Sequence, residues 1–364
     1  GYTINGGTSG NVILLGNSSV ASANGCIGMD LAAWRENSYT ADGIVRTVNG
    51  SINVVGRASS GTSHNLAIAI DATNTNGIKR NIFAATGSGS VSIDGLATGT
   101  SPLDVRLTNV DLLSGSGAIT TIARGTSGIH IGGYNIGDGL FIGQKAGSLV
   151  ESSSSAISLI ADNIQLTKPL ITNSTGALII ESLSNSFTSD ITLSNKTTTS
   201  HSSLRIGKTS NTFNISLGGT TSIAGPINVY GRTISIIDNL NTTSGATNGD
   251  VLLKSTTDIS VAASKSITTN GGDVIFWSDT DENGGLILIN DNVTINSING
   301  STSSNLSGGG KIVFAGGADD GSNGGIALDG IPDGTAKSAT GNGIRIGSTT
   351  ANFSQLYSGG GDIL

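Results

Sequence analysis

Short apolar runs recur at intervals along this chain, each bounded by Gly, Asn, Asp or Ser. Two neighbouring stretches show the pattern: GGDVIFWSDTDENGGLILIN (residues 271–290) and GGGKIVFAGGADDGSNGGIALD (residues 308–329). Each has glycines, a four-residue apolar run, an acidic stretch with Gly and Asn, a second Gly-Gly and another apolar run. Runs this short and this rich in β-branched residues are typical of strands, and no stretch shows a helical period.

The spacing of these runs indicates how the strands are arranged. Val274, Val293 and Ile312 follow one another at equal intervals, and Val251 precedes Val274 by a slightly longer one. A period near 20 with several short strands per repeat is the signature of a β-solenoid, in which each coil stacks on the one before. The sequence therefore predicts an all-β fold, a right-handed parallel β-helix with about 20 residues per coil and little α-helix.

Side chains alternate between the two faces of a strand, which gives a prediction for the core. Val274 and Phe276 are expected to point inward, and Ile275 and Trp277 outward. The separation of Phe276 and Phe314 is twice the interval between Val274 and Val293. The two phenylalanines are therefore expected to occupy equivalent inward positions two coils apart.

The composition supports an ordered chain in spite of its 55 glycines among 364 residues. Only 12% of the residues are charged, and disordered chains usually combine high charge with few β-branched residues. No linker divides the chain into regions of different amino-acid composition, so residues 1–364 are predicted to form a single elongated β-solenoid. Residues 1–150 are expected to form less regular coils and residues 151–364 more regular ones, as a segment of a longer protein.

Charge and cysteine content exclude several classes of protein. The formal net charge is −7, and the 18 Lys and Arg residues are scattered, so no basic stripe marks a nucleic-acid partner. An acidic and weakly charged surface does not favour anionic membranes, and membrane insertion is not expected. Cys26 is the only cysteine, so it cannot form an intrachain disulfide and is expected to be a small buried residue.

The C-terminal part of the chain carries a family likeness. Its elements are INVYGRTISIIDNLNTT, GDVLLKSTTDISVAASKSITTNGGDVIFWSDTD, GGLILINDNVTINSING and GGGKIVFAGG, together with AISLIADNIQLTKPLITNSTGALIIES at 156–182. This pattern resembles the repeat region of filamentous-haemagglutinin-like surface proteins, the large exoproteins and β-strand-repeat adhesins of Gram-negative bacteria. The resemblance implies a right-handed parallel β-helix, export to the cell surface and a role in adhesion or the extracellular matrix. The Asn-Pro-Asn-type motif of the family's secretion domain is missing, which favours a stalk or passenger segment.

The acidic stretch at 279–284 has two interpretations. Asp279, Asp281 and Asn283 alternate before Gly284, which partly matches a calcium-binding loop, although the twelfth position holds Asn290 instead of Glu. Asp, Asn and Gly also suit a tight, solvent-facing corner that binds nothing. Ca²⁺ is thus a candidate ligand of Asp279, Asp281 and Asn283, and no other cofactor is expected.

Catalysis has little support in the sequence. Polysaccharide lyases and hydrolases also use β-helices, and they need several acidic and basic side chains clustered on one face. His64, His130 and His201 are isolated from such groups in the sequence, so no catalytic residue is assigned. The stretch WREN, with Asp30 nearby, is the exception: Trp34 could stack on a sugar, or the stretch could be a loop that packs over a coil.

These observations favour a non-enzymatic extracellular surface or matrix protein, acting as an adhesin stalk or filament subunit. Its expected location is secreted or at the cell surface of a Gram-negative bacterium. Its expected partners are other copies of itself end to end or neighbouring coils of a longer chain, and surface glycans or host-cell receptors. The alternative is a carbohydrate-active β-helix enzyme, a polysaccharide lyase or hydrolase.

Overall fold

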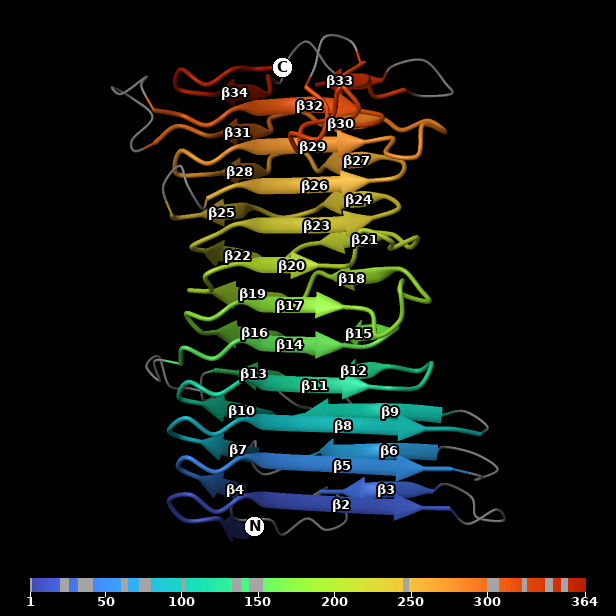
Figure 1. The fold of residues 1–364 in the computed structure, drawn as a ribbon, viewed down its shortest axis with the longest axis vertical. Helices are drawn as coiled ribbons and strands as arrows, with labels where there is room; N and C mark the ends of the chain where they lie inside the picture. Colours follow the sequence, from blue (N-terminus) through green and yellow to red (C-terminus); the bar gives the residue numbers. More distant parts are fainter. Residues whose placement is uncertain are drawn as a thin grey trace. The chain divides into compact units, whose positions relative to one another are not determined.

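A computed structural model describes most of the chain. The described residues are 2–19, 26–31, 42–59, 65–71, 80–99, 102–132, 139–143, 153–244, 249–299, 308–322, 326–337, 343–347 and 353–364. They contain strands and turns but no α-helix, as the sequence predicts. Internal contacts divide the chain into an N-terminal unit, Gly1–Ser189 with Asn195–Thr198, and a C-terminal unit, Asp190–Ser194 with Thr199–Leu364. Each unit is a stack of coils (Figure 1).

In the N-terminal unit the chain passes in turn through three sheets. The first contains β1 (Thr3–Asn5), β4 (Gly43–Thr47), β7 (Asn81–Ala85), β10 (Val110–Ser114), β13 (Leu140–Ile142), β16 (Leu170–Asn173) and β19 (Lys196–Thr199). The second contains β2 (Val12–Ser18), β5 (Ile52–Ala58), β8 (Val91–Ala97), β11 (Ile119–Ala123), β14 (Ile157–Ile160) and β17 (Leu178–Glu181). The third contains β3 (Ile27–Asp30), β6 (Asn65–Asp71), β9 (Pro102–Thr108), β12 (Ile129–Ile131) and β15 (Ile164–Leu166).

The C-terminal unit repeats this order. Its first sheet contains β22 (Thr220–Ile223), β25 (Leu240–Thr242), β28 (Ser266–Thr268), β31 (Thr294–Asn296) and β34 (Gln355–Tyr357). The second contains β20 (Leu204–Ile206), β23 (Ile227–Gly231), β26 (Val251–Ser255), β29 (Val274–Ser278) and β32 (Ile312–Gly316). The third contains β18 (Ile191–Leu193), β21 (Ile215–Leu217), β24 (Ile234–Ile236), β27 (Ile259–Val261), β30 (Ile287–Ile289) and β33 (Ile344–Ile346).

Neighbouring strands in each sheet are parallel, which confirms the predicted parallel β-helix. The sequence predicts a regular period of about 20 residues per coil. The coils of the structure vary in length more than this prediction allows. Val251 pairs with Val274, a step of 23, but Val274 pairs with Ile312, a step of 38. In the N-terminal unit Val12 pairs with Ile52, a step of 40. Coils lengthen where residues are inserted between strands, because strand register fixes only the strands themselves.

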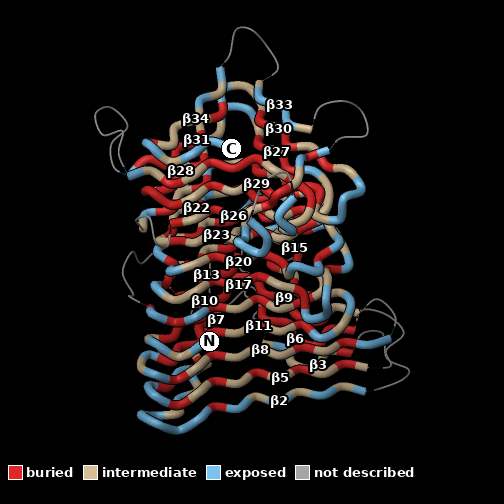
Figure 2. Tube along the Cα trace, turned by 45° about the horizontal axis from the view of Figure 1, so that its top comes forward, coloured by how far each residue is buried: buried red, intermediate tan, exposed pale blue. Residues whose placement is uncertain are grey.

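The predicted core of β29 is confirmed, with one correction. Val274 and Phe276 are fully buried, and Ile275 faces outward and is half-buried. Phe276 pairs directly with Phe314 in the adjacent coil, so the prediction that they lie two coils apart is wrong. Figure 2 shows the same alternation of buried and half-buried residues along the strands of both units. Cys26 is buried, as expected.

In most coils a glycine marks the corner before the second sheet, which explains the glycines that open the two stretches at 271 and 308; Ser155 and Ser202 hold this position before β14 and β20. A Cβ atom on Gly89 would overlap the carbonyl oxygen of Gly50 in the coil before it. In the C-terminal unit, a Cβ on Gly272 would overlap the backbone of Gly249. Adjacent coils thus approach so closely at Gly89 and Gly272 that only glycine fits there.

Asp and Asn residues before strands also have a structural role. The Asp250 carboxylate accepts a hydrogen bond from the Asp273 N–H (2.8 Å), and Asp273 in turn accepts one from the Lys311 N–H (2.7 Å). Likewise, the Asp258 carboxylate accepts a hydrogen bond from the Leu286 N–H (2.8 Å). Each side chain therefore caps a backbone donor of the next coil, which stabilises the register of the stack.

Candidate functional site

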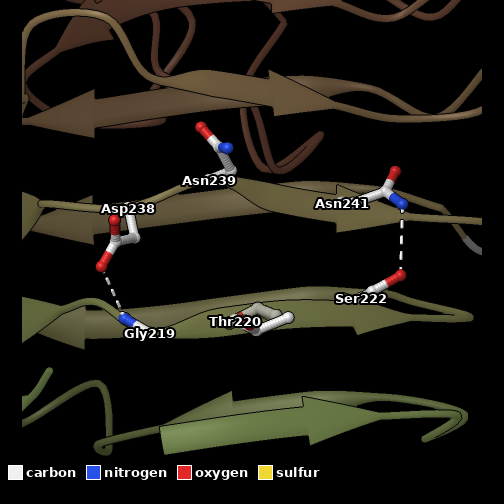
Figure 3. A pocket seen from close by; sticks show the side chains of 7 residues that line it. Gly219, Thr220, Ser222, Asp238, Asn239 and Asn241 are labelled. Atoms are coloured by element: carbon white, nitrogen blue, oxygen red, sulfur yellow. Dashed lines mark hydrogen bonds between the residues drawn. The ribbon is translucent and has the colours of Figure 1, made fainter. Parts of the chain in front are cut away.

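A polar groove lies on the first sheet of the C-terminal unit, along β22 and β25 (Figure 3). Its volume is ≈ 330 Å³, near the lower end of cavities that hold small ligands. Its lining residues are Gly219, Thr220, Thr221, Ser222, Asp238, Asn239 and Asn241. Five of the seven lining residues carry a hydroxyl or amide side chain, and none is aromatic.

The polar groups of the groove are held by bonds between coils. Asp238 accepts hydrogen bonds from the Gly219 N–H (2.8 Å) and from Lys265 Nζ (2.8 Å). Asn241 Nδ2 donates to Ser222 Oγ at 3.2 Å, as Figure 3 shows. The charge of Asp238 is therefore compensated, and the groove presents a mostly neutral surface of donors and acceptors.

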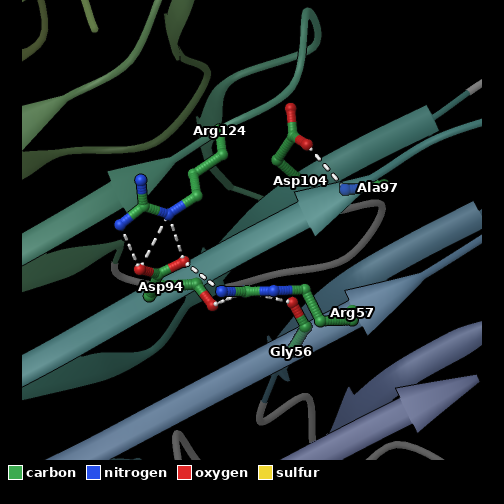
Figure 4. A network of polar contacts seen from close by, with 6 residues as sticks. All are labelled: Gly56, Arg57, Asp94, Ala97, Asp104 and Arg124. Atoms are coloured by element: carbon green, nitrogen blue, oxygen red, sulfur yellow. Dashed lines mark hydrogen bonds and ion pairs between the residues drawn. The ribbon is translucent and has the colours of Figure 1, made fainter.

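A charged network lies on the second sheet of the N-terminal unit (Figure 4). Asp94, on β8, lies between two arginines: Arg57 Nη2 is 2.9 Å and Arg124 Nη2 is 2.6 Å from its carboxylate. Burial alone raises the pKa of Asp94, but the hydrogen bond from Arg124 and the charges of both arginines outweigh burial and leave this pKa below its usual value. Three neighbouring coils contribute one residue each, so the network joins them.

The depressed pKa of Asp94 predicts a pH dependence of stability. A carboxylate with a lowered folded-state pKa stabilises the fold fully above its usual pKa of 3.8, and this contribution is lost as the pH falls through the folded-state value. Asp94→Asn should lower the free energy of unfolding at pH 7 by about 0.5–1 kcal/mol, a small value because Arg124 is partly exposed. Urea unfolding at pH 7 and pH 3 checks this: the difference between the two proteins should shrink at pH 3. An equal difference at both pH values would contradict it.

Asp104, on β9, is a buried carboxylate in a structural role. Its oxygens accept hydrogen bonds from the Ala97 N–H (2.8 Å; Figure 4) and the Gly128 N–H (2.8 Å). Burial raises the pKa of Asp104 more than these backbone donors lower it. The carboxylate thereby satisfies backbone groups at the corner between the second and third sheets.

The third sheet of the N-terminal unit brings together two basic groups that are separated in the sequence. Arg106 on β9 and His130 on β12 are cross-strand partners. Burial, and then the charge of Arg106, lowers the pKa of His130, so its imidazole is neutral near pH 7. His130 Nε2 lies 3.3 Å from Thr167 Oγ1. His201 is buried, and His64 lies outside the described residues.

Another pair that the sequence analysis missed lies on the first sheet of the N-terminal unit. Arg80 Nε donates to the buried Asp111 carboxylate at 2.5 Å, and its guanidinium carbon lies 4.5 Å from the centre of the Phe141 ring. Arg80 Nη2 also donates to the Val110 carbonyl oxygen at 2.8 Å. The Arg80 and Asp111 side chains are nearly inaccessible to solvent, so the pair joins coils and does not form an open site.

The predicted site residues have different environments. Trp34, the candidate sugar contact, lies outside the described residues, as does the rest of the WREN stretch. Asp279, Asp281 and Asn283 lie in the loop after β29: the Asp279 side chain is buried, whereas Asp281 and Asn283 are exposed. Among the described residues no three His, Cys, Asp or Glu side chains converge on a point where they could hold a metal ion.

No family model, curated protein or solved structure matches the chain. Within the described ranges, no helix is long and apolar enough to cross a membrane.

Proposed function

We propose that the chain is a non-enzymatic surface or matrix protein, secreted or displayed by a Gram-negative bacterium, and that it acts as an adhesin stalk or filament subunit. The observation that carries this proposal is the continuous bonding from coil to coil. Backbone ladders, the glycine corner and the side-chain caps at residues such as Asp250 and Asp273 all link one coil to the next. A stack of coils bonded in this way is rigid along its axis, so it can act as a spacer between the groups attached to it. The sequence likeness to filamentous-haemagglutinin-like proteins supports the same role.

The polar groove along β22 and β25 supports a glycan as a partner. Its hydroxyl and amide groups match the donors and acceptors of sugar hydroxyls, as in many carbohydrate contacts. The direct test of the proposed location is immunogold electron microscopy of cells that make the protein, with antibodies against the purified chain. Labelling of the cell surface or of extracellular filaments is expected. Labelling confined to the cell interior would refute the proposal.

The alternative, a carbohydrate-active enzyme, is favoured by one observation. Arg106 and the neutral His130 lie side by side on an outward face of the N-terminal unit, and such groups can stabilise charge and accept a proton in a polysaccharide lyase. A screen of acidic and neutral polysaccharides for chain cleavage separates the two functions. Cleavage that disappears in His130→Ala would favour the enzyme over the stalk.

Exposed strand edges support association between coils of different chains. Leu14, at an inward position of β2, is only half-buried, whereas Val54, which pairs with it, is fully buried. Likewise Ile346 on β33 is 46% exposed, whereas Ile289, which pairs with it, is fully buried. Unpaired strands beside apolar side chains recruit further strands. We propose that another copy of the chain or neighbouring coils of a longer chain cover these edges.

We therefore expect the isolated chain to associate as its concentration rises, which light scattering would measure. Leu14→Lys places a charge at an inward position of β2 and should reduce association, because the side chain would face the junction. Ile13→Lys is the matched control, since Ile13 faces outward on the same strand. A chain that stays monomeric at all concentrations, with both terminal coils protected from hydrogen exchange, would contradict this prediction.

A further inference from the structure

The corner after β29 contains more residues than the same corner one coil earlier. In the second sheet Val251 pairs with Val274, a step of 23. In the third sheet Ile259 pairs with Ile287, a step of 28. The longer step places extra residues between β29 and β30, within the acidic loop 279–285. The shorter corner before it shows that the stack can turn without them.

Two oxygen atoms in this corner are buried and make no hydrogen bond. They are Ser278 Oγ and Asp279 Oδ2, and both residues are 0% exposed. The other carboxylate oxygen, Asp279 Oδ1, accepts the Gly284 N–H at 2.6 Å. In the preceding coil the equivalent hydroxyl, Ser255 Oγ, donates to the Thr257 carbonyl oxygen at 3.0 Å. The longer corner thus leaves unpaired a hydroxyl that the shorter corner satisfies.

A buried carboxylate with one unpaired oxygen is unfavourable unless a positive charge or a donor compensates it. Asp279 forms no ion pair with any described residue. The Ser278 carbonyl oxygen also retains acceptor capacity, because the Gly317 N–H that it accepts at 3.3 Å is shared with the Asp279 carbonyl oxygen (3.2 Å), which accepts the Glu282 N–H as well (3.0 Å). Carboxylate, hydroxyl and carbonyl oxygens are the ligands of hard cations.

We propose that this corner binds Ca²⁺, with Asp279 as the anchoring carboxylate and with Ser278 Oγ and the Ser278 carbonyl oxygen as further ligands. The site differs from the alternating loop that the sequence suggested. The side chains of Asp281 and Asn283 are exposed, and Asp281 Oδ1 accepts the Asn283 N–H at 3.3 Å. With a single anchoring carboxylate, the dissociation constant should be on the order of 0.1–1 mM, as in extracellular calcium modules.

Thermal unfolding of the full chain, stripped with EDTA and dialysed, tests the proposal. The midpoint should rise with added CaCl₂ over the millimolar range and then level off, because a ligand of the folded state stabilises it by mass action. MgCl₂ should have a smaller effect, since Mg²⁺ demands a stricter octahedral geometry. Trp277, close to Asp279 in the chain, should sensitise Tb³⁺ luminescence, and Ca²⁺ should reverse that signal.

Two variants make the test specific. Asp279→Asn keeps the size of the side chain and should weaken Ca²⁺ binding at least tenfold. Asp320→Asn removes the same charge from an exposed residue in the second acidic stretch and should leave binding unchanged. Wild-type protein without a saturable Ca²⁺ effect, or an effect kept in full by Asp279→Asn, would overturn the proposal. So would an equal loss in both variants, which indicates nonspecific charge screening.

A third variant covers the case in which Asp279→Asn does not fold. Ser278→Ala removes the unpaired hydroxyl and leaves the carboxylate in place. It should fold and bind Ca²⁺ about threefold more weakly. Unchanged Ca²⁺ affinity in a folded Ser278→Ala protein, together with unchanged Tb³⁺ luminescence, would show that the ion does not bind at this corner.

Discussion

Replacing Gly89 by Ala is expected to lower the free energy of unfolding by at least about 3 kcal/mol, the upper range for forcing extra atoms into a packed interior. The new Cβ would overlap the Gly50 carbonyl oxygen. That oxygen is backbone and lies just before β5, which pairs along its whole length with β8 of the next coil, so it cannot move aside locally. Relief would require the two coils to separate along a whole corner. Urea unfolding at neutral pH measures the change.

The matched control for this substitution is Gly7→Ala. Gly7 has a positive φ of 71°, and a Cβ there would meet no atom within 4 Å. Its replacement costs only the backbone strain of a left-handed residue, about 1–2 kcal/mol. Gly89 does not have such a φ, so its cost is steric alone. If Gly89→Ala cost no more than Gly7→Ala, close stacking of the glycines would not determine the register of the coils.

The fold class could be predicted from the sequence because the same local pattern recurs in every coil. Alternating apolar residues give strands with one inward face, and Gly, Asn and Asp give the corners. Val274 and Phe276 were assigned inward by this rule, and they are fully buried. Trp277 shows its limit. It points outward, yet it is only 7% exposed, because Lys254 lies over its ring and its Nε1 donates to the Gly317 carbonyl oxygen at 2.8 Å.

The coil length could not be predicted, because strands of different sheets share one sequence pattern. Val293 lies midway in sequence between Val274 and Ile312, but it borders β31 of the first sheet, whereas Val274 lies on β29 of the second. The residue that pairs with Val274 is Ile312, after a full turn. A spacing between two strands of one coil therefore looked like the spacing between two coils. Only the hydrogen-bonded register distinguishes the two cases.

The polar networks were missed for a related reason. Arg57 and Asp94 are 37 apart in the sequence, and Asp94 and Arg124 are 30 apart, so no fixed period connects them. The groove on β22 and β25 also combines residues of successive coils. By contrast, the acidic loop that contains Asp279 is local in sequence and could be identified. What the sequence could not show is that burial leaves one of its carboxylate oxygens unpaired.

Phe276→Ala is the second substitution with a large expected effect. Phe276 is fully buried, and replacing a buried Phe by Ala removes apolar contacts and leaves a cavity, so we expect a loss of about 3–5 kcal/mol in the free energy of unfolding. Phe353→Ala removes the same atoms from a side chain that is 76% exposed and should change stability by no more than about 0.5 kcal/mol. A loss below about 0.5 kcal/mol for Phe276→Ala would show that the register of β29 is wrong.

The pairing of Phe276 with Phe314 can be tested separately from burial. The two rings are edge to face, with centroids 5.2 Å apart and planes at 62°. Such aromatic pairs contribute about 0.5–1.5 kcal/mol beyond their buried area, so a double-mutant cycle of Phe276→Ala and Phe314→Ala should give a coupling energy in that range. If the rings were two coils apart, at about 10 Å, their effects would add within about 0.5 kcal/mol. Additive effects would therefore favour the two-coil spacing that the sequence suggested, and a clear coupling energy would establish that the chain completes a single coil between Phe276 and Phe314.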